Sequence, residues 1–353
     1  MQLVAYGAQD IYLTGNPQIT FFKVVYRRHT NFAMESIEQT FNGTVGEGNR
    51  VTCTVSRNGD LVHRMYLQAV SKNDNGKNAS KLGHQLMSEV ELEIGGQRVD
   101  KHYADWLEVW SQLSLPEGVR AGYETMTGNT NADGDGTRTD TYYVPLQFWF
   151  CRNPGLALPL IALQYHEVKV NVTFGTIADT VLQSASLWVD YVYLDTDERR
   201  RFAQVSHEYL IEQLQFTGDE SEFSRARLNF NHPVKELVWV GTTGSFGTYS
   251  ANLTNAKLQL NGHDRFAERL GSYFNLVQPY QHHTRIPSGN VYVYSFALKP
   301  EEHQPSGTCN FSRIDNATLN MSWSSPPSAL KVYAVNYNVL RVMSGMGGLA
   351  YSN

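Results

Sequence analysis

The chain has 353 residues, of which 41% are hydrophobic and 18% charged, a composition typical of a globular protein and not of a disordered one. Its formal net charge of −5 gives no general attraction to polyanions, so we expect no direct nucleic-acid partner. Three scattered cysteines favour a reducing compartment, and the lack of a signal sequence or of a run of ~20 apolar residues favours a protein made in the cytosol.

The first feature along the chain is an apolar segment that turns basic, Ile19–Ala33 (ITFFKVVYRRHTNFA). It fits neither the helical nor the strand period, and it precedes the first expected strand, Glu35–Phe41. We therefore expect residues 1–33 to form an N-terminal arm outside the β-sandwich. The candidate assembly residues of this arm are four apolar side chains that need burial and two arginines: Phe21, Phe22, Val24, Val25, Arg27 and Arg28.

Alternation of apolar and polar residues then predicts several strands with one buried face. The clearest are Val51–Val55, Glu89–Ile94 and Val168–Phe174. Two other segments, Ser186–Leu194 and Leu330–Leu340, are apolar on both faces, which predicts strands covered on both sides. Clusters of Gly, Asn, Asp and Pro separate the segments, as in a sandwich or barrel.

Helical periodicity is sparse. Its best example is His102–Leu113, where aromatic and aliphatic residues recur at spacings near 3.6. Asp100 precedes this segment and is its expected N-cap.

An internal repeat relates the two halves of the chain. Glu91–Arg98 matches Lys257–Asp264, and each is a strand followed by a tight turn at a glycine. Further on, Val168–Phe174 matches Ala317–Trp323. The offset between the copies falls by about 17 residues from the first match to the second, so we expect additional residues in the first copy, as an exposed loop within Gly118–Thr141.

The repeat predicts an all-β chain made of two tandem antiparallel sandwiches. Each has about eight strands and a short helix in its long connections. We expect the first sandwich over residues 34–200 and the second over residues 201–353, with the join near the charged run Asp195–Arg201.

No motif in the sequence predicts chemistry. Gly128–Thr137, with Asp140 beyond it, imitates the spacing of a calcium loop, but its flanks are not amphipathic helices and a hairpin tip is the favoured interpretation. The pair His282–His283 has no acid or cysteine beside it and is interpreted as part of a polar loop. We therefore predict no catalytic residue, no metal and no cofactor.

Two asparagines are candidate glycosylation sites. Asn78 and Asn252 both stand in Asn-x-Ser/Thr sequences, in expected loops between matching strands of the two copies.

Four long segments resemble the major capsid proteins of nucleocytoplasmic large DNA viruses, especially those of the algal-virus and iridovirus type. The segments are Gly7–Phe32, Glu91–Gln97, Gln304–Arg313 and Tyr337–Tyr351. The resemblance covers essentially the whole chain, although the loops of this chain are short for the type.

The resemblance implies a double jelly roll, two eight-stranded sandwiches in tandem, and a structural function in the virion. It implies homotrimers that contact neighbouring capsomers and tile an icosahedral shell over an internal membrane, with synthesis and assembly in the host cytoplasm. The long connections expected to form outward towers are about 71–86, 102–141, 241–256 and 266–289.

The arm has two interpretations within this family. In the first, its apolar residues dock on the base of their own or a neighbouring jelly roll, while Arg27 and Arg28 contact a neighbour, a minor capsid protein or lipid headgroups. In the second, the segment is an additional edge strand of the first sandwich.

Two other functions are alternatives. A lectin-like carbohydrate-binding protein would present an exposed aromatic platform on a sandwich face or loop tip. An enzyme of cupin type would need clustered histidine and carboxylate ligands, and the required His-x-His pair is not in the sequence.

Overall fold

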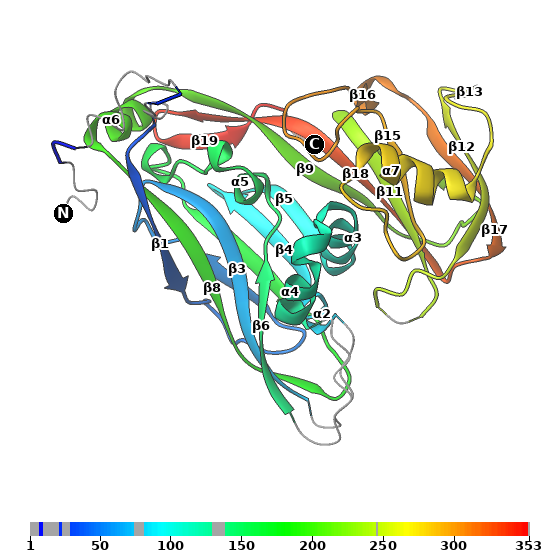
Figure 1. The fold of residues 1–353 in the computed structure, drawn as a ribbon, viewed down its shortest axis with the longest axis horizontal. Helices are drawn as coiled ribbons and strands as arrows, with labels where there is room; N and C mark the ends of the chain where they lie inside the picture. The colour runs from blue at the N-terminus through cyan, green and yellow to red at the C-terminus, as the bar shows by residue number, and fades with distance from the viewer. Residues whose placement is uncertain are drawn as a thin grey trace.

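The computed structural model describes residues 7–9, 21–22, 29–73, 81–128, 138–244 and 246–351. It contains two jelly rolls side by side, the first on the left of Figure 1 and the second on the right. The predicted all-β double sandwich is therefore confirmed.

The first jelly roll has eight strands in two four-stranded antiparallel sheets, with the orders β1-β8-β3-β6 and β2-β7-β4-β5. Cys53 and Val170 are fully buried between the sheets, as their alternating patterns predict, and Leu187 of β8 is fully buried there as well. The first strand begins at Phe32, three residues earlier than expected. The strands are β1 (Phe32–Gln39), β2 (Arg50–Thr54), β3 (Leu61–Asn73), β4 (Met87–Ile94), β5 (Gln97–Tyr103), β6 (Arg138–Pro145), β7 (Val168–Phe174) and β8 (Thr180–Leu194).

The second jelly roll repeats this strand order. One sheet runs β15-β11-β18-β9, with β16 on β11 and β19 on β18, and the other runs β10-β17-β12-β13, with β14 on β12. The two matches of the sequence repeat fall on equivalent strands, β4–β5 with β12–β13 and β7 with β17. The strands are β9 (His207–Glu220), β10 (Arg225–Arg227), β11 (Pro233–Thr242), β12 (Asn252–Leu260), β13 (His263–Asp264), β14 (Arg269–Leu270), β15 (Val291–Ser295), β16 (Cys309–Asn310), β17 (Ala317–Ser325), β18 (Ala329–Met343) and β19 (Met346–Leu349).

The helices lie mainly in the connections. The expected helix is confirmed as α3 (Ala104–Ser114), but the segment expected as an exposed loop contains a second helix, α4 (Glu117–Thr127). Pro116 is the N-cap of α4, and Gly128 is its C-cap at a φ of +75°, a conformation that glycine adopts without strain. The others are α2 (Leu82–Leu86), α5 (Trp149–Arg152), α6 (Thr196–Gln204), α7 (Gln278–His282), the 3-10 turns η1 (Pro154–Leu156), η2 (Leu160–Ala162) and η4 (Phe311–Arg313), and the π-helix η3 (Tyr273–Val277).

Two expectations about the helices are wrong in detail. Asp100 does not cap α3, because it lies within β5, and Tyr103 occupies the N-cap position without a side-chain hydrogen bond. The long connection between β11 and β12 contains no helix among its described residues, 243–244 and 246–251. Within the described ranges, no helix is both long and apolar enough to cross a lipid bilayer.

The C-terminal part of the second jelly roll covers one end of the core of the first. Leu340 of β18 pairs with Tyr209 of β9 on one edge and with Leu349 of β19 on the other. Leu340 and Val342 belong to the same apolar core as Val170 and the rest of the first jelly roll. The two jelly rolls therefore share core residues at this end of the molecule.

Gly347 on β19 allows this close packing, and substituting it tests the contact. A Cβ at Gly347 would lie 2.6 Å from Leu163 Cδ2 and 3.3 Å from Ile94 Cγ2. We expect Gly347→Val to lower the free energy of unfolding by about 1–3 kcal/mol, the usual cost of overpacking, measured by urea denaturation. The matched control is Gly348→Val on the same strand, where the nearest atom is Gln97 Oε1 at 3.8 Å. Equal effects of the two substitutions would contradict the packing argument.

Candidate functional site

The most elaborate arrangement of side chains in the described structure is the junction between the two jelly rolls, and α3 is at its centre. Trp106, Val109, Trp110 and Leu113 project from α3 and are buried against the outer face of the sheet that contains β11, β15 and β18. Along β11, Leu237 and Trp239 face the core of the second jelly roll, and Val238 and Val240 face α3. The helix of one jelly roll thus covers a sheet of the other (Figure 1).

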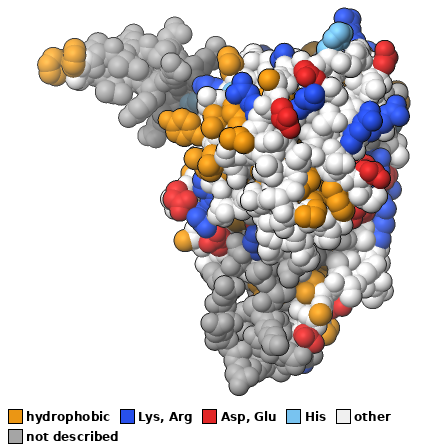
Figure 2. Space-filling view, turned by 90° about the vertical axis from the view of Figure 1, so that its right-hand side faces the viewer, with side chains coloured by type: hydrophobic (Ala, Val, Ile, Leu, Met, Phe, Trp, Pro, Cys, Tyr) orange, Lys and Arg blue, Asp and Glu red, His pale blue; other side chains and the backbone are white. Residues whose placement is uncertain are grey.

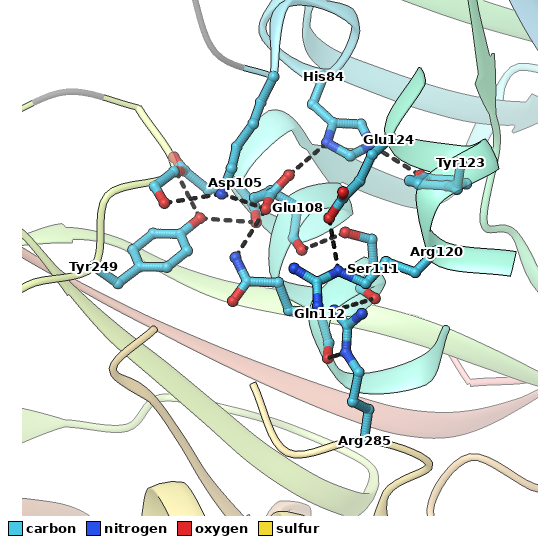
Figure 3. A network of polar contacts seen from close by, with 12 residues as sticks. His84, Asp105, Glu108, Ser111, Gln112, Arg120, Tyr123, Glu124, Tyr249 and Arg285 are labelled. Carbon is cyan, nitrogen blue, oxygen red and sulfur yellow. Dashed lines mark hydrogen bonds and ion pairs between the residues drawn. The ribbon is translucent and has the colours of Figure 1, made fainter. Parts of the chain in front are cut away.

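The polar side of α3 carries a buried network centred on Glu108 (Figure 3). Its carboxylate lies 2.5 Å from Lys81 Nζ and 2.9 Å from His84 Nδ1, and it accepts a hydrogen bond from Gln112. Burial alone raises the pKa of Glu108, but the interactions with His84 and Lys81 outweigh it and lower the pKa to about 2. Lys81 also donates to the carbonyl of Gly247 in the second jelly roll.

Arg285 of the second jelly roll binds the C-terminal end of α3. Its Nε donates to the carbonyl of Gln112 at 2.9 Å, and its backbone N–H donates to the carbonyl of Leu113 at 3.1 Å. The last carbonyls of a helix have no partner within the helix and carry partial negative charge, so a cation is favourable there. At the other end of α3, Asp105 pairs with Lys331 of β18 and accepts a hydrogen bond from Tyr249 (labelled in Figure 3).

The order Glu108–His84–Tyr123 resembles the carboxylate–imidazole–hydroxyl series of nucleophilic catalysis. His84 Nε2 lies 2.9 Å from the Tyr123 hydroxyl. Burial and the nearby charge of Glu108 raise the pKa of Tyr123 well above its usual value. The phenol therefore stays protonated, and the series is better suited to holding α2, α3 and α4 together than to attacking a substrate.

A second buried ionic cluster joins the jelly rolls at Glu212 of β9. Its carboxylate lies 2.7 Å from Arg152 of the first jelly roll and 2.8 Å from Lys235 of β11, and His303 approaches to 3.3 Å. Burial raises the pKa of Glu212, but the charge of Arg152, the hydrogen bond with His303 and the charge of Lys235 outweigh it and lower the pKa to about 2. Arg152 also lies over the ring of Trp110 at 5.3 Å, which links the ionic cluster to the apolar one.

A third cluster contains His283, whose side chain is fully buried. Its Nε2 lies 2.8 Å from Glu236 and its Nδ1 2.8 Å from Glu301. Burial lowers the pKa of His283, but the two carboxylates outweigh it and raise the pKa to about 9. The imidazolium is therefore charged at neutral pH, and it fixes the end of α7 to β11 and to the turn at Glu301.

The sheet edges of the two jelly rolls also meet at the junction. Strand β5 is an edge of one sheet, and β9 is an edge of another. Leu214 N–H of β9 donates to the Asp100 carboxylate at 3.0 Å, and Gln213 donates to the carbonyl of Val99. Side chains thus form hydrogen bonds with backbone groups that would otherwise be free to pair with a strand of another chain.

An apolar groove of about 850 Å³ lies at the end of the first jelly roll that carries α6, and we call it the basal groove. It is lined by Thr30, Phe32, Met34, Leu61, His63, Arg64, Pro154, Gly155, Ala157, Asp190, Val192, Leu194, Glu198, Arg201, Phe202, Ser206, His207, Glu208 and Tyr209.

The predicted arm residues are only partly within the described structure. Phe21 and Phe22 are described, with exposures of 100% and 101%. Val24, Val25, Arg27 and Arg28 lie outside the described residues, as do Asn78 and the calcium-like loop at 129–137. Asn252 is exposed, but as the first residue of β12.

The described residues contain no cluster of three or more His, Cys, Asp or Glu side chains that could hold a metal ion. The three cysteines are free, and burial raises the pKa of Cys53 to about 11 and of Cys151 to about 12. Such thiols behave as small apolar side chains.

Sequence reasoning missed every ionic residue of the junction. His283 was interpreted as part of a polar loop because no acid stands beside it in sequence, whereas Glu236 lies 47 positions earlier. The available signal was Glu236 itself, a carboxylate within the apolar run Pro233–Thr242, because a buried charge needs a partner.

The structure offers one candidate for the aromatic platform of a lectin-like protein. Tyr66 and Trp188 stack at 6.2 Å, and Tyr143, 39% exposed, lies 6.2 Å from Tyr66. The three side chains come from β3, β8 and β6 of one sheet.

Two family models together match nearly the whole chain. The model for the major capsid protein N-terminus matches residues 20–195, and the model for the large eukaryotic DNA virus major capsid protein matches residues 198–348.

Individual proteins agree with these models. The major capsid protein of Pyramimonas orientalis virus is 62% identical over 100% of this chain and 99% of its own length. The crystal structure of PBCV-1 VP54 superposes with a TM-score of 0.88 at 46% identity, over 95% of this chain and all of that one. The Faustovirus major capsid protein shares the fold at a TM-score of 0.76 and 11% identity, over 92% of this chain and 93% of that one.

These relatives favour a capsid protein over a lectin-like one. The alignment with the Pyramimonas orientalis virus protein spans 391 positions, more than the 353 residues of this chain. That relative therefore carries insertions that this chain lacks.

The Glu212 cluster predicts an acid-sensitive contribution to stability. Glu212→Gln would leave Arg152 and Lys235 without their carboxylate, and we expect a loss of about 3–5 kcal/mol at pH 7. Because folding depresses the pKa of Glu212 from 4.5 to about 2, this contribution is present above pH 4.5 and is lost as the pH falls to about 2. In urea denaturation, the difference in free energy of unfolding between wild type and variant should be smaller at pH 3 than at pH 7. The control is Glu208→Gln on the same strand, whose pair with Arg341 is exposed and is worth at most about 1 kcal/mol.

The His283 cluster predicts the opposite pH dependence. Folding raises the pKa of His283 from 6.5 to about 9, so its contribution is complete below pH 6.5 and is lost as the pH rises through 9. We expect His283→Gln to have a lower free energy of unfolding than wild type at pH 7. By pH 10 the two free energies should be equal, as measured by urea denaturation at both pH values. His282→Gln, next in sequence, is the control, and a gap for His283→Gln that stays constant with pH would show that the imidazolium is not the cause.

Proposed function

Because this chain belongs to the family of large eukaryotic DNA virus major capsid proteins, we propose that it is the structural subunit of a virion shell and assembles as a homotrimer. The observation that carries this proposal is the 62% identity to a major capsid protein over the full chain, together with a double jelly roll that superposes on PBCV-1 VP54. As a capsid protein, the chain is a component of the virion.

The duplicated fold gives the physical reason for a trimer. Three chains with two similar sandwiches each supply six sandwiches around one axis, so a threefold particle can fill a hexagonal tile. Such tiles would contact neighbouring capsomers and cover an icosahedral shell over an internal membrane. A quasi-atomic model of the PBCV-1 virus capsid contains a chain that is 45% identical to this one, and it supports a place in a capsid by analogy.

An exposed apolar surface on the second jelly roll supports contacts between copies. Figure 2 faces this jelly roll and shows hydrophobic side chains gathered in its upper left part. Tyr280 and Leu298 are 76% and 72% exposed, and Leu276 is 48% exposed. His282 contacts the carbonyl of Leu298 at 3.0 Å, which places Leu298 beside α7. Monomeric proteins rarely leave several large apolar side chains together in water, so a second copy is the expected cover.

The arm is proposed as an assembly element. Phe21 is fully exposed, and its burial would provide a driving force for contact with another molecule. Arg27 and Arg28 would then meet acidic groups of a neighbouring capsomer or minor capsid protein, or the headgroups of the membrane. Assembly is proposed to take place in the host cytoplasm, without direct contact to nucleic acid.

We infer no enzymatic function. The buried titratable groups of the junction are engaged with one another, as His84 is with Glu108 and Tyr123. Asn252 at the start of β12, and Asn78 by its sequence, stay as candidate glycosylation sites.

Negative-stain imaging and light scattering of the purified chain test the trimer. We expect threefold particles with a hexagonal outline and three times the chain mass of 39.9 kDa. A stable, well-folded monomer at nanomolar concentration would overturn the proposal.

Charge placed on the apolar surface of the second jelly roll should weaken the trimer. We expect Tyr280→Asp and Leu298→Asp to shift the mass toward the monomer, because a carboxylate in a buried apolar contact costs several kcal/mol. Val119→Asp on α4 is the control, since Val119 is 54% exposed on the other jelly roll. Trimers of unchanged stability in both variants would place the contact elsewhere.

A further inference from the structure

The basal groove has an unusually apolar floor for the outer face of a sheet. Phe32 and Met34 of β1 project into it beside Val192 and Leu194 of β8, with which they pair in register. The inner face of this sheet already packs on the core of the first jelly roll, so the outer face is expected to be polar. Phe32 and Met34 are nevertheless 52% and 48% exposed.

Packed apolar side chains form the walls of the groove. Leu61, Ala157 and Leu194 form a separate buried cluster with Phe202 of α6 packed against it. Phe202 in turn stacks on His207 of β9 at 5.1 Å, so the end of the second jelly roll completes the wall. Both jelly rolls therefore hold the groove in shape.

The charges at the groove suit a cationic, apolar segment. Three carboxylates line it: Glu198 pairs with Arg201, Glu208 pairs with Arg341, and Asp190 lies on the floor. The chain itself contains such a segment in Ile19–Arg28, with four apolar candidate arm residues and the cations Lys23, Arg27 and Arg28. No acidic residue occurs between Asp10 and Glu35.

We propose that the basal groove of one copy binds the segment Ile19–Arg28 of a second copy. The inference rests on the proposed assembly, which brings copies together. Phe21 of the same chain is fully exposed, so it does not fill its own groove. Thr30 lines the groove, and the eight residues from Thr30 back to Phe22 can extend up to ~27 Å, far enough to leave it for an adjacent molecule.

The bound segment would place its apolar side chains on Phe32, Met34 and Val192. Arg27 or Arg28 would then approach Asp190, which is half-buried on the floor of the groove. Added salt is expected to weaken the association, because it screens these charge pairs.

Disulfide trapping between two full-length chains tests the proposal. One chain carries Val24→Cys and the other Met34→Cys, both with Cys309→Ser because Cys309 is the half-buried native thiol. After mixing and mild oxidation, we expect a disulfide-linked pair that contains one chain of each kind. The control replaces Met34→Cys by Val119→Cys, an exposed position on α4 of the same jelly roll.

Two outcomes of the trapping would overturn the inference. Trimers without any link would refute the groove as the docking site and leave the proposed function intact. In a third variant that carries both Val24→Cys and Met34→Cys, a link that forms only within one chain would show that each arm occupies its own groove.

A peptide measurement decides the case in which no trimer forms and the proposed function itself fails. A labelled peptide of residues 17–30 should bind the full chain, with fluorescence anisotropy as the readout. We expect Met34→Glu to weaken this binding by about tenfold or more and Val119→Glu to leave it unchanged. A peptide that does not bind, or that binds equally to both variants, would refute the docking site.

Discussion

The burial of α3 against the second jelly roll is the contact on which the rest of this molecule depends. Trp106 and Trp110 each remove a large apolar area from water, which is worth roughly 2–3 kcal/mol per side chain. Without them, Val238 and Val240 of β11 would be exposed on the outer face of a sheet. The second jelly roll therefore needs a helix that belongs to the first, and neither half of the duplicated chain has a complete surface by itself.

The buried ion pairs of this junction determine the relative orientation of the jelly rolls more than they add to the free energy of unfolding. Removing an ion pair from water costs about as much as the pair returns, so Glu212 with Arg152 and Lys235 is a weak source of net stability. An alternative docking of the jelly rolls, however, would leave these charges buried and unpaired, at a cost of several kcal/mol. The ionic clusters consequently penalise every orientation but one, and the apolar contact around α3 supplies the free energy that holds it.

The sequence predicts what is local and periodic. Alternation along Val168–Phe174 identifies β7, and the repeat identifies the duplication because equivalent strands keep their patterns. Partners distant in sequence leave no such signal. His283 and Glu236 were not recognised as a pair, and Asp100 was assigned to a helix cap, whereas its carboxylate binds Leu214 N–H across the junction. The sequence predicts a loop in place of α4 because the few apolar residues of this segment alternate with glycines and threonines that are typical of turns.

The duplication has produced two jelly rolls with the same strand order and different surfaces. The first carries the basal groove, and the second carries the apolar surface around Tyr280. Contacts between unlike surfaces of successive copies are heterologous, and they close into a ring only when the rotation from one copy to the next divides a full turn. In the proposed trimer, part of that rotation is fixed within each chain by the angle between its own jelly rolls. Side chains buried within each chain, such as Trp110 and Glu212, would therefore help to determine whether the proposed contacts between copies close at three subunits or continue as an open filament.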